Sequence, residues 1–104
     1  MQLIVHKIRL HNSSDADAFE AWVIDTDYAT CPDLPSVVAF TVQRAAAGSD
    51  FDYFEVVTIT DMAAFEADMQ TPQFQSLVAR FSQLADVVEE ITGDQLGDGY
   101  NRGP

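Results

Sequence analysis

The stretch from residue 51 to residue 72 constrains the fold more than any other part of this chain. Its first ten residues, FDYFEVVTIT, are rich in aromatic and β-branched side chains, and they predict a strand over residues 51–60. Met62, Phe65 and Met69 then recur at helical spacing, which predicts a short helix directly after the strand. The chain is therefore expected to contain a strand that leads straight into a helix.

Glu55 is the least expected residue of this strand, because it lies among Phe, Val and Ile side chains and shares one strand face with Tyr53. Burying a carboxylate costs several kcal/mol unless the group is paired or neutralised. Two interpretations stay open at this point. Glu55 is either a pocket residue with a chemical role, or a structural residue at a sheet edge or in a dimer contact.

The rest of the chain completes a regular alternation of elements. The same strand signals recur three more times, over residues 3–10, 36–45 and 87–92. A first helix is expected to begin near residue 14 and to fade around residues 27–31, where Pro32 and Pro35 forbid continuation.

The second helical region restarts at Thr71 and Pro72, with threonine as the N-cap and proline at the first helical position. The order β-α-β-β-α-β predicts an α+β, ferredoxin-like fold, in which right-handed crossovers put both helices on one face of a four-stranded antiparallel sheet.

The other face of this sheet should be polar if the chain is a monomer, and it is not. Residues 36–45 and 51–60 both carry apolar side chains on their two faces. An exposed apolar face of several hundred Å² indicates association. We therefore expect a homodimer whose sheets pack face to face. Residues 1–92 are the predicted domain, and residues 93–104 are a polar, glycine-rich tail that is mobile unless it docks on a partner.

The charge of the chain excludes several classes of partner. The 104 residues carry 17 acidic and five basic side chains, a formal net charge of −12, and the five bases form no cluster in the sequence. Nucleic-acid and anionic-membrane binding are excluded, because phosphate recognition needs clustered Lys or Arg.

Cys31 is the sole cysteine, so no internal disulfide forms and a cytoplasmic location is expected. The apolar N-terminal run is cut by His6 and Lys7, so neither a signal peptide nor a membrane span is predicted.

The usual motifs for metals and phosphates are missing as well. His6 and His11 are five residues apart on an extended strand, hence on opposite faces, and cannot jointly bind a metal. The glycines at 97 and 99 do not lie between a strand and a helix, so a phosphate-binding loop is excluded. We expect no metal.

Three stretches of the sequence carry a resemblance to a known family. These are residues 27–37 (DYATCPDLPSV), 51–56 (FDYFEV) and 61–72 (DMAAFEADMQTP). Their order and spacing resemble the dimeric α+β barrel superfamily and, more narrowly, its HapK/RedY-like family of prodigiosin-type and bisindole biosynthesis pathways. The resemblance covers roughly residues 3–92. It implies a small homodimeric protein of antibiotic biosynthesis, free of metal and cofactor, that holds an apolar intermediate between sheet and helices and assists its cyclisation or condensation.

The plant polyketide cyclases with this barrel resemble the chain more loosely. They carry a pocket histidine in the first strand, which His6 matches, and a tyrosine and a histidine flanking a His-Pro step in the second helix. The matching step here is Thr71-Pro72, flanked by Asp68 and Phe74. The acid/base pair of those enzymes is therefore not intact, which argues against transferring their reaction.

His6, Glu55 and Tyr53 are the candidate catalytic residues. An imidazole titrates near neutral pH and exchanges protons at little cost. A carboxylate in an apolar pocket has a raised pKa and can act as a base, and a phenol beside it can stabilise an oxyanion. The alternative for His6 is a core histidine satisfied by a neighbour.

The candidate substrate-binding residues come from the end of the first helix and from the aromatic positions. Asp27, Tyr28 and Cys31 lie where a helix-to-strand loop would form a pocket mouth, although Cys31 has no histidine nearby in sequence to activate it. For Asp27 we favour the structural alternative, a loop closed by hydrogen bonds of Asp and Tyr side chains. Trp22 or Phe40 could stack on a pyrrole or indole ring, with core packing as the alternative. Asp68 and Phe74 complete the set, and for Asp68 we favour a solvated helix position.

Three functions remain possible from the sequence. The preferred one is a cofactor-free cyclase or condensation enzyme acting on a small aromatic substrate. The second is a non-catalytic protein that binds and shields a reactive intermediate. The third is a cofactor-independent monooxygenase, another activity hosted by this superfamily.

Overall fold

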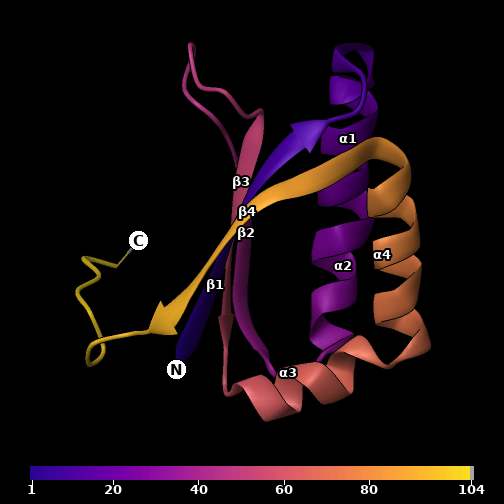
Figure 1. Ribbon diagram of the computed structural model, residues 1–104. Coiled ribbons are helices and arrows are strands. Elements are labelled where there is room, and N and C mark those ends of the chain that lie inside the picture. Colours follow the sequence, from indigo (N-terminus) through magenta and orange to yellow (C-terminus); the bar gives the residue numbers. More distant parts are fainter. Residues whose placement is uncertain (104) are drawn as a thin grey trace.

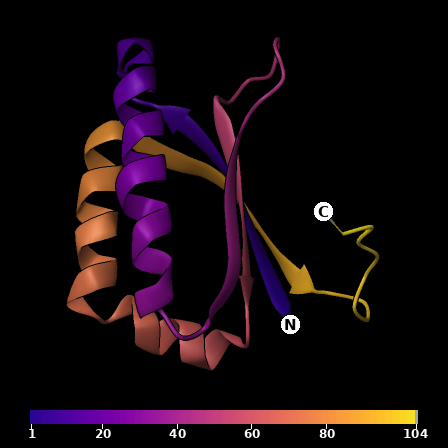
Figure 2. The same ribbon diagram turned by 180° about the vertical axis from the view of Figure 1, so that it is seen from behind.

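The computed structural model describes residues 1–103 and shows one antiparallel sheet with the helices packed against one of its faces (Figure 1, Figure 2). The strands lie in the order β2-β3-β1-β4 and span Gln2–Leu10 (β1), Val37–Arg44 (β2), Tyr53–Ile59 (β3) and Ala85–Asp94 (β4). The helices span Ala16–Trp22 (α1), Tyr28–Thr30 (α2), Met62–Met69 (α3) and Pro72–Leu84 (α4). The predicted ferredoxin-like arrangement is confirmed.

The first helical region ends where the sequence predicted, although its middle part is irregular. A π-helical segment, Val23–Asp27, joins α1 to α2, and a 3-10 turn over Cys31–Asp33 follows. The prediction that the helix fades around residues 27–31 is therefore confirmed, because the α-helical conformation ends at Thr30. Pro32 is tolerated because it lies in the first turn of the 3-10 segment, where an N–H group would have no helical partner.

The last strand is longer than the sequence predicted. β4 begins at Ala85 and runs to Asp94, past the predicted boundary at residue 92. It pairs with the whole of β1, from Gln2 opposite Asp94 to Leu10 opposite Ala85. The backbone hydrogen bonds of this central strand therefore extend β4 at both ends.

The register of β1 and β3 fixes which side chains face the helices. Ile4 lies opposite Val57, and Ile8 lies opposite Tyr53. These two pairs belong to separate buried clusters, the first packed with α3 and the second with Phe19 of α1. The His6–Glu55 pair lies between them on the same face, because side chains alternate along a strand.

The opposite face of the sheet carries no helix in the described chain (Figure 1). It combines an apolar row across three strands with a neighbouring row that contains the Lys7–Glu89 ion pair. Val5 lies opposite Val56 and Ile91 on this face, and Ile91 is exposed. The segment after β4 runs out on this same side of the sheet (Figure 2).

Candidate functional site

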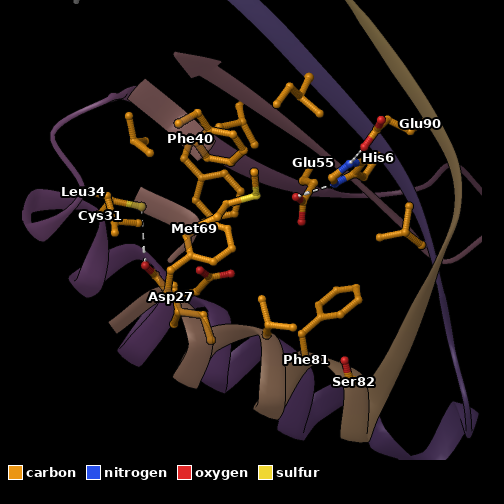
Figure 3. A pocket seen from close by; sticks show the side chains of 18 of the residues that line it. His6, Asp27, Cys31, Leu34, Phe40, Glu55, Met69, Phe81, Ser82 and Glu90 are labelled. Carbon is orange, nitrogen blue, oxygen red and sulfur yellow. Dashed lines mark hydrogen bonds and ion pairs between the residues drawn. The ribbon is translucent and has the colours of Figure 1, made fainter. Parts of the chain in front are cut away.

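A cavity of about 540 Å³ lies between the sheet and the helices (Figure 3). Helix α3 contributes Met62, Phe65 and Met69 to its lining, and α4 contributes its apolar stripe from Phe74 to Phe81. Thr71 caps α4 by accepting a hydrogen bond from the amide of Phe74 at 3.3 Å, and Pro72 begins the helix, as predicted. The apolar stripe of α4 faces the cavity.

His6 is held on the sheet side of the cavity between two carboxylates from the neighbouring strands (Figure 3). Its Nδ1 lies 3.0 Å from Oε2 of Glu55, and its Nε2 lies 2.7 Å from Oε2 of Glu90. The pairing places both contacts, since His6 of the central strand lies opposite Glu55 in β3 and opposite Glu90 in β4. The His6 and Glu55 side chains are 21% and 15% exposed, whereas Glu90 is 59% exposed.

These contacts determine the charge of the imidazole. The hydrogen bond to Glu55 raises the pKa of His6, burial opposes it, and Glu90 raises the pKa further. A ring that donates to a carboxylate from each nitrogen must carry both protons. The geometry therefore favours His6 as a charged proton donor.

Asp27 lies on the helical side of the cavity, across from His6 (Figure 3). Burial, followed by the negative charge of Glu55, raises the pKa of Asp27 to about 7. Asp27 is the last residue of the π-helical segment, and such segments are frequent at functional sites. Asp27 can therefore gain or lose a proton close to neutral pH.

Cys31 also lines the cavity, next to Asp27. Its Sγ lies 3.5 Å from the backbone oxygen of Asp27. Burial, together with the charges of Asp27 and Glu55, raises the pKa of the Cys31 thiol to about 11. A thiol of this kind stays protonated at neutral pH, which agrees with the weak case for a nucleophile made from the sequence.

Tyr53 does not join His6 and Glu55. Its hydroxyl donates a hydrogen bond of 2.7 Å to Glu20, which also accepts from Arg44, and its ring packs on Phe19. Burial, followed by the contact with Glu20, raises the pKa of the Tyr53 phenol. The three predicted catalytic residues share one sheet face, but only His6 and Glu55 line the cavity.

Two predicted substrate-binding residues have structural contacts instead of lining this cavity. The hydroxyl of Tyr28 accepts a hydrogen bond from the amide of Val42 at 2.9 Å and so ties α2 to β2. Asp68 is buried, and its Oδ2 accepts from the amide of Ser36 at 2.8 Å and from the Ser36 hydroxyl. The solvated position favoured for Asp68 was wrong, because the chain entering β2 supplies two donors for its carboxylate.

The other four predicted substrate-binding residues do line the cavity: Trp22, Asp27, Phe40 and Phe74. Sequence reasoning missed Glu90, along with Phe81, Ser82 and Asp86. The sequence shows two adjacent glutamates, Glu89 and Glu90, in β4. Which of them faces the helices depends on an irregularity in the β1–β4 register between Lys7 and Ile8. Strand alternation alone could not place Glu90 beside His6.

Comparison with known proteins gives the family. Residues 2–96 match the model of a protein family described as "HapK: REDY-like protein HapK". The chain belongs to this family. HapK from Hahella chejuensis has a crystal structure that is 58% identical in sequence, with a TM-score of 0.94 over 99% of this chain and 100% of that one. The resemblance seen in the sequence is thus confirmed.

More distant structures share the fold alone. SnoaB, a cofactor-independent oxygenase from Streptomyces nogalater, is 21% identical, with a TM-score of 0.73 over 94% of this chain and 97% of its own. A putative antibiotic biosynthesis monooxygenase from Chloroflexus aurantiacus J-10-fl is 18% identical, with a TM-score of 0.72 over 98% of both chains. A search of curated proteins finds no significant match.

Within residues 1–103, no three or more His, Cys, Asp and Glu side chains are grouped so that they could hold a metal ion. No helix in the described part of the chain is long and apolar enough to span a bilayer.

Proposed function

We propose that this HapK-family protein is a cofactor-free, cytoplasmic enzyme of secondary metabolism. It would promote cyclisation or condensation of a pyrrole- or indole-type intermediate by acid/base catalysis. One observation carries this proposal: the cavity brings a proton donor, His6, and a titratable carboxyl, Asp27, to opposite sides of an apolar space. The family match and the aromatic lining residues support the choice of substrate.

In the proposed reaction, a nucleophilic ring carbon attacks a carbonyl carbon and a C–C bond forms. His6 donates its proton to the carbonyl oxygen, and ionised Asp27 accepts the proton released by the attacking ring carbon, so that a carbinol forms. Asp27 then returns this proton to the carbinol hydroxyl, which leaves as water, and the resulting cation loses an N–H proton to neutral His6. Glu55 and Glu90 keep His6 charged through their hydrogen bonds. The apolar walls exclude bulk water, which would compete for both groups.

We further propose that the protein works as a homodimer joined through the face of the sheet that carries no helix. The apolar row of Val56, Val5 and Ile91 supports this arrangement, because Ile91 is half exposed and uncovered apolar area favours association. Two copies packed through this face would leave both cavities on the outer, helical sides.

The condensation of pyrrole-2-carbaldehyde with 2,4-dimethylpyrrole tests the reaction, because its dipyrrin product absorbs visible light. We expect the wild-type protein to accelerate dipyrrin formation, and Asp27→Asn and Glu55→Gln each to reduce this rate by about 10²-fold or more. Asp25→Asn is the matched control, because this aspartate lies on the same helical region but is exposed to solvent. Equal rates for Asp27→Asn and Asp25→Asn would contradict the proposed role of Asp27.

The same assay separates the two alternatives. A binding and shielding protein would bind the pyrroles without changing the rate, and the fully hydrogen-bonded His6 is the observation that favours it. A monooxygenase would need dissolved oxygen, so its activity would disappear under argon. We expect the dipyrrin rate to be unchanged under argon.

A further inference from the structure

The charged side chains that line the cavity are almost all of one sign. Four carboxylates, from Asp27, Glu55, Asp86 and Glu90, line it, and His6 is the one basic residue among them in the described chain. We infer that this site takes an organic cation: its substrate is, or becomes during the reaction, a positively charged nitrogen heterocycle. This inference rests on the proposed function and specifies the charge of its substrate.

The basic side chains of the protein are engaged elsewhere. Arg44 pairs with Glu20, Lys7 with Glu89, Arg9 with the backbone of Asp50, Arg80 with Gln83, and Arg102 lies over the ring of Tyr100. These contacts lie outside the lining of the cavity. An anionic ligand would therefore meet no guanidinium or ammonium group there.

The charge balance within the site leaves a net negative potential. Protonated His6 offsets one of its two carboxylate partners, and the second carboxylate remains. Asp86 is paired with His11 at 3.1 Å, and Asp27 adds a negative charge when it ionises. In a partly buried site this surplus attracts a cation more strongly than it would in water.

The lining favours an organic cation over a metal ion. Trp22, Phe40, Phe65, Phe74 and Phe81 present aromatic rings to the cavity, and the negative faces of such rings attract delocalised cations. No His, Cys, Asp or Glu cluster suited to a metal is found among residues 1–103. A flat heterocyclic cation can stack on these rings while its N–H groups donate to a carboxylate.

The proposed chemistry generates such a cation. When a pyrrole or indole adds to an aldehyde, the resulting carbinol loses its protonated hydroxyl as water. The C–O electron pair leaves with the oxygen, and the positive charge spreads over the ring nitrogen. Groups that stabilise this charge act in the transition state and raise the rate. The same carboxylates would repel an enolate.

Binding of three indoles that differ in charge tests the inference by calorimetry at pH 7.5. Tryptamine is cationic, tryptophol is neutral and indole-3-propionate is anionic, while the ring system is the same. We expect affinity to fall in that order, with at least about a tenfold difference between the first and the last. Equal or tighter binding of indole-3-propionate, or no binding of tryptamine, would overturn the inference.

Variants of two adjacent residues test whether the preference for cations arises in the cavity. Glu90→Gln removes a carboxylate of the cavity. It should reduce the ratio of the affinities for tryptamine and indole-3-propionate at least threefold. Glu89→Gln removes the same charge from the adjacent residue, which pairs with Lys7 and does not line the cavity, and should leave the ratio within twofold. Equal narrowing in both variants would assign the preference to the overall charge of the protein and overturn the inference. A clear charge preference without dipyrrin formation would instead contradict the proposed catalysis alone.

Discussion

At the scale of single residues, the site separates two titrating groups by their surroundings. His6 gains a proton because two carboxylates accept its N–H groups, and Asp27 keeps its proton longer because it is buried near the charge of Glu55. Both pKa values move upwards, but the consequences differ. A raised pKa favours the charged form of the imidazole and the neutral form of the carboxyl. His6 is thus held in its charged, donating form, and Asp27 can gain or lose a proton near neutral pH.

The pKa of Asp27 leads to a prediction on stability. The unfolded chain loses this proton near pH 3.8 and the folded protein near pH 7, so the folded state loses stability as the pH rises between those values. Asp27→Asn cannot ionise, and we expect it to raise the free energy of unfolding by up to about 4 kcal/mol at pH 8. The gain should shrink as the pH is lowered towards 4, as measured by urea unfolding.

The control for this measurement is Asp25→Asn, which should change the unfolding free energy by less than about 0.5 kcal/mol at either pH. A loss of stability in Asp27→Asn at pH 8 would mean that the charged carboxylate has a favourable partner. Asp27→Asn should therefore be more stable but less active than the wild type, as expected where a group that costs stability serves function.

At the scale of elements, the contact between Asp68 of α3 and Ser36 before β2 holds together the end of the cavity that α3 lines. Asp68→Ala would leave the buried amide and hydroxyl of Ser36 without their acceptor. We expect a loss of about 2–4 kcal/mol in the free energy of unfolding. Glu66→Ala, on the exposed side of the same helix, should cost less than about 0.5 kcal/mol.

The affinity for tryptamine provides the second measurement for Asp68. Asp68 lies outside the cavity lining, so Asp68→Ala should bind tryptamine within threefold of the wild type at a temperature where both are folded. A loss of binding without a loss of stability would return Asp68 to the substrate-binding residues assigned from the sequence.

The elements also show what the sequence could predict. Alternation along residues 3–10 and 51–60 grouped His6 with Ile4 and Ile8, and Glu55 with Tyr53, but it left open which face of the sheet meets the helices. The Thr71-Pro72 signal located the start of α4 correctly. These features depend on local spacing. The position of Glu90 depends on a register irregularity between two strands that are far apart in sequence, and the hydroxyl of Tyr53 was drawn away by Glu20. Such contacts follow from tertiary packing, which single-strand patterns do not encode.

At the scale of the whole molecule, two surfaces compete as sites of association. Ile91 on the uncovered sheet face is 50% exposed, and Ile24 on the helical side is 64% exposed. Exposure alone would favour Ile24. Ile91, however, lies opposite Val5, which in turn lies opposite Val56, so it belongs to an apolar row across three strands. Ile24 is followed instead by the exposed polar residues Asp25 and Thr26. Continuous apolar area drives association more than a single exposed side chain does.

The two isoleucines therefore give a matched pair of variants for the dimer. In sedimentation velocity at micromolar protein, the wild type and Ile24→Lys should both have the mass of two chains, about 23 kDa from the 11.5 kDa of one. Ile91→Lys would bury an ammonium between the two sheets at a cost of several kcal/mol, enough to convert a micromolar dimer to monomer. A monomeric wild type would contradict sheet-to-sheet pairing. A dimer lost in Ile24→Lys but kept in Ile91→Lys would move the interface to the helices, and the cavities would then face the partner chain instead of solvent.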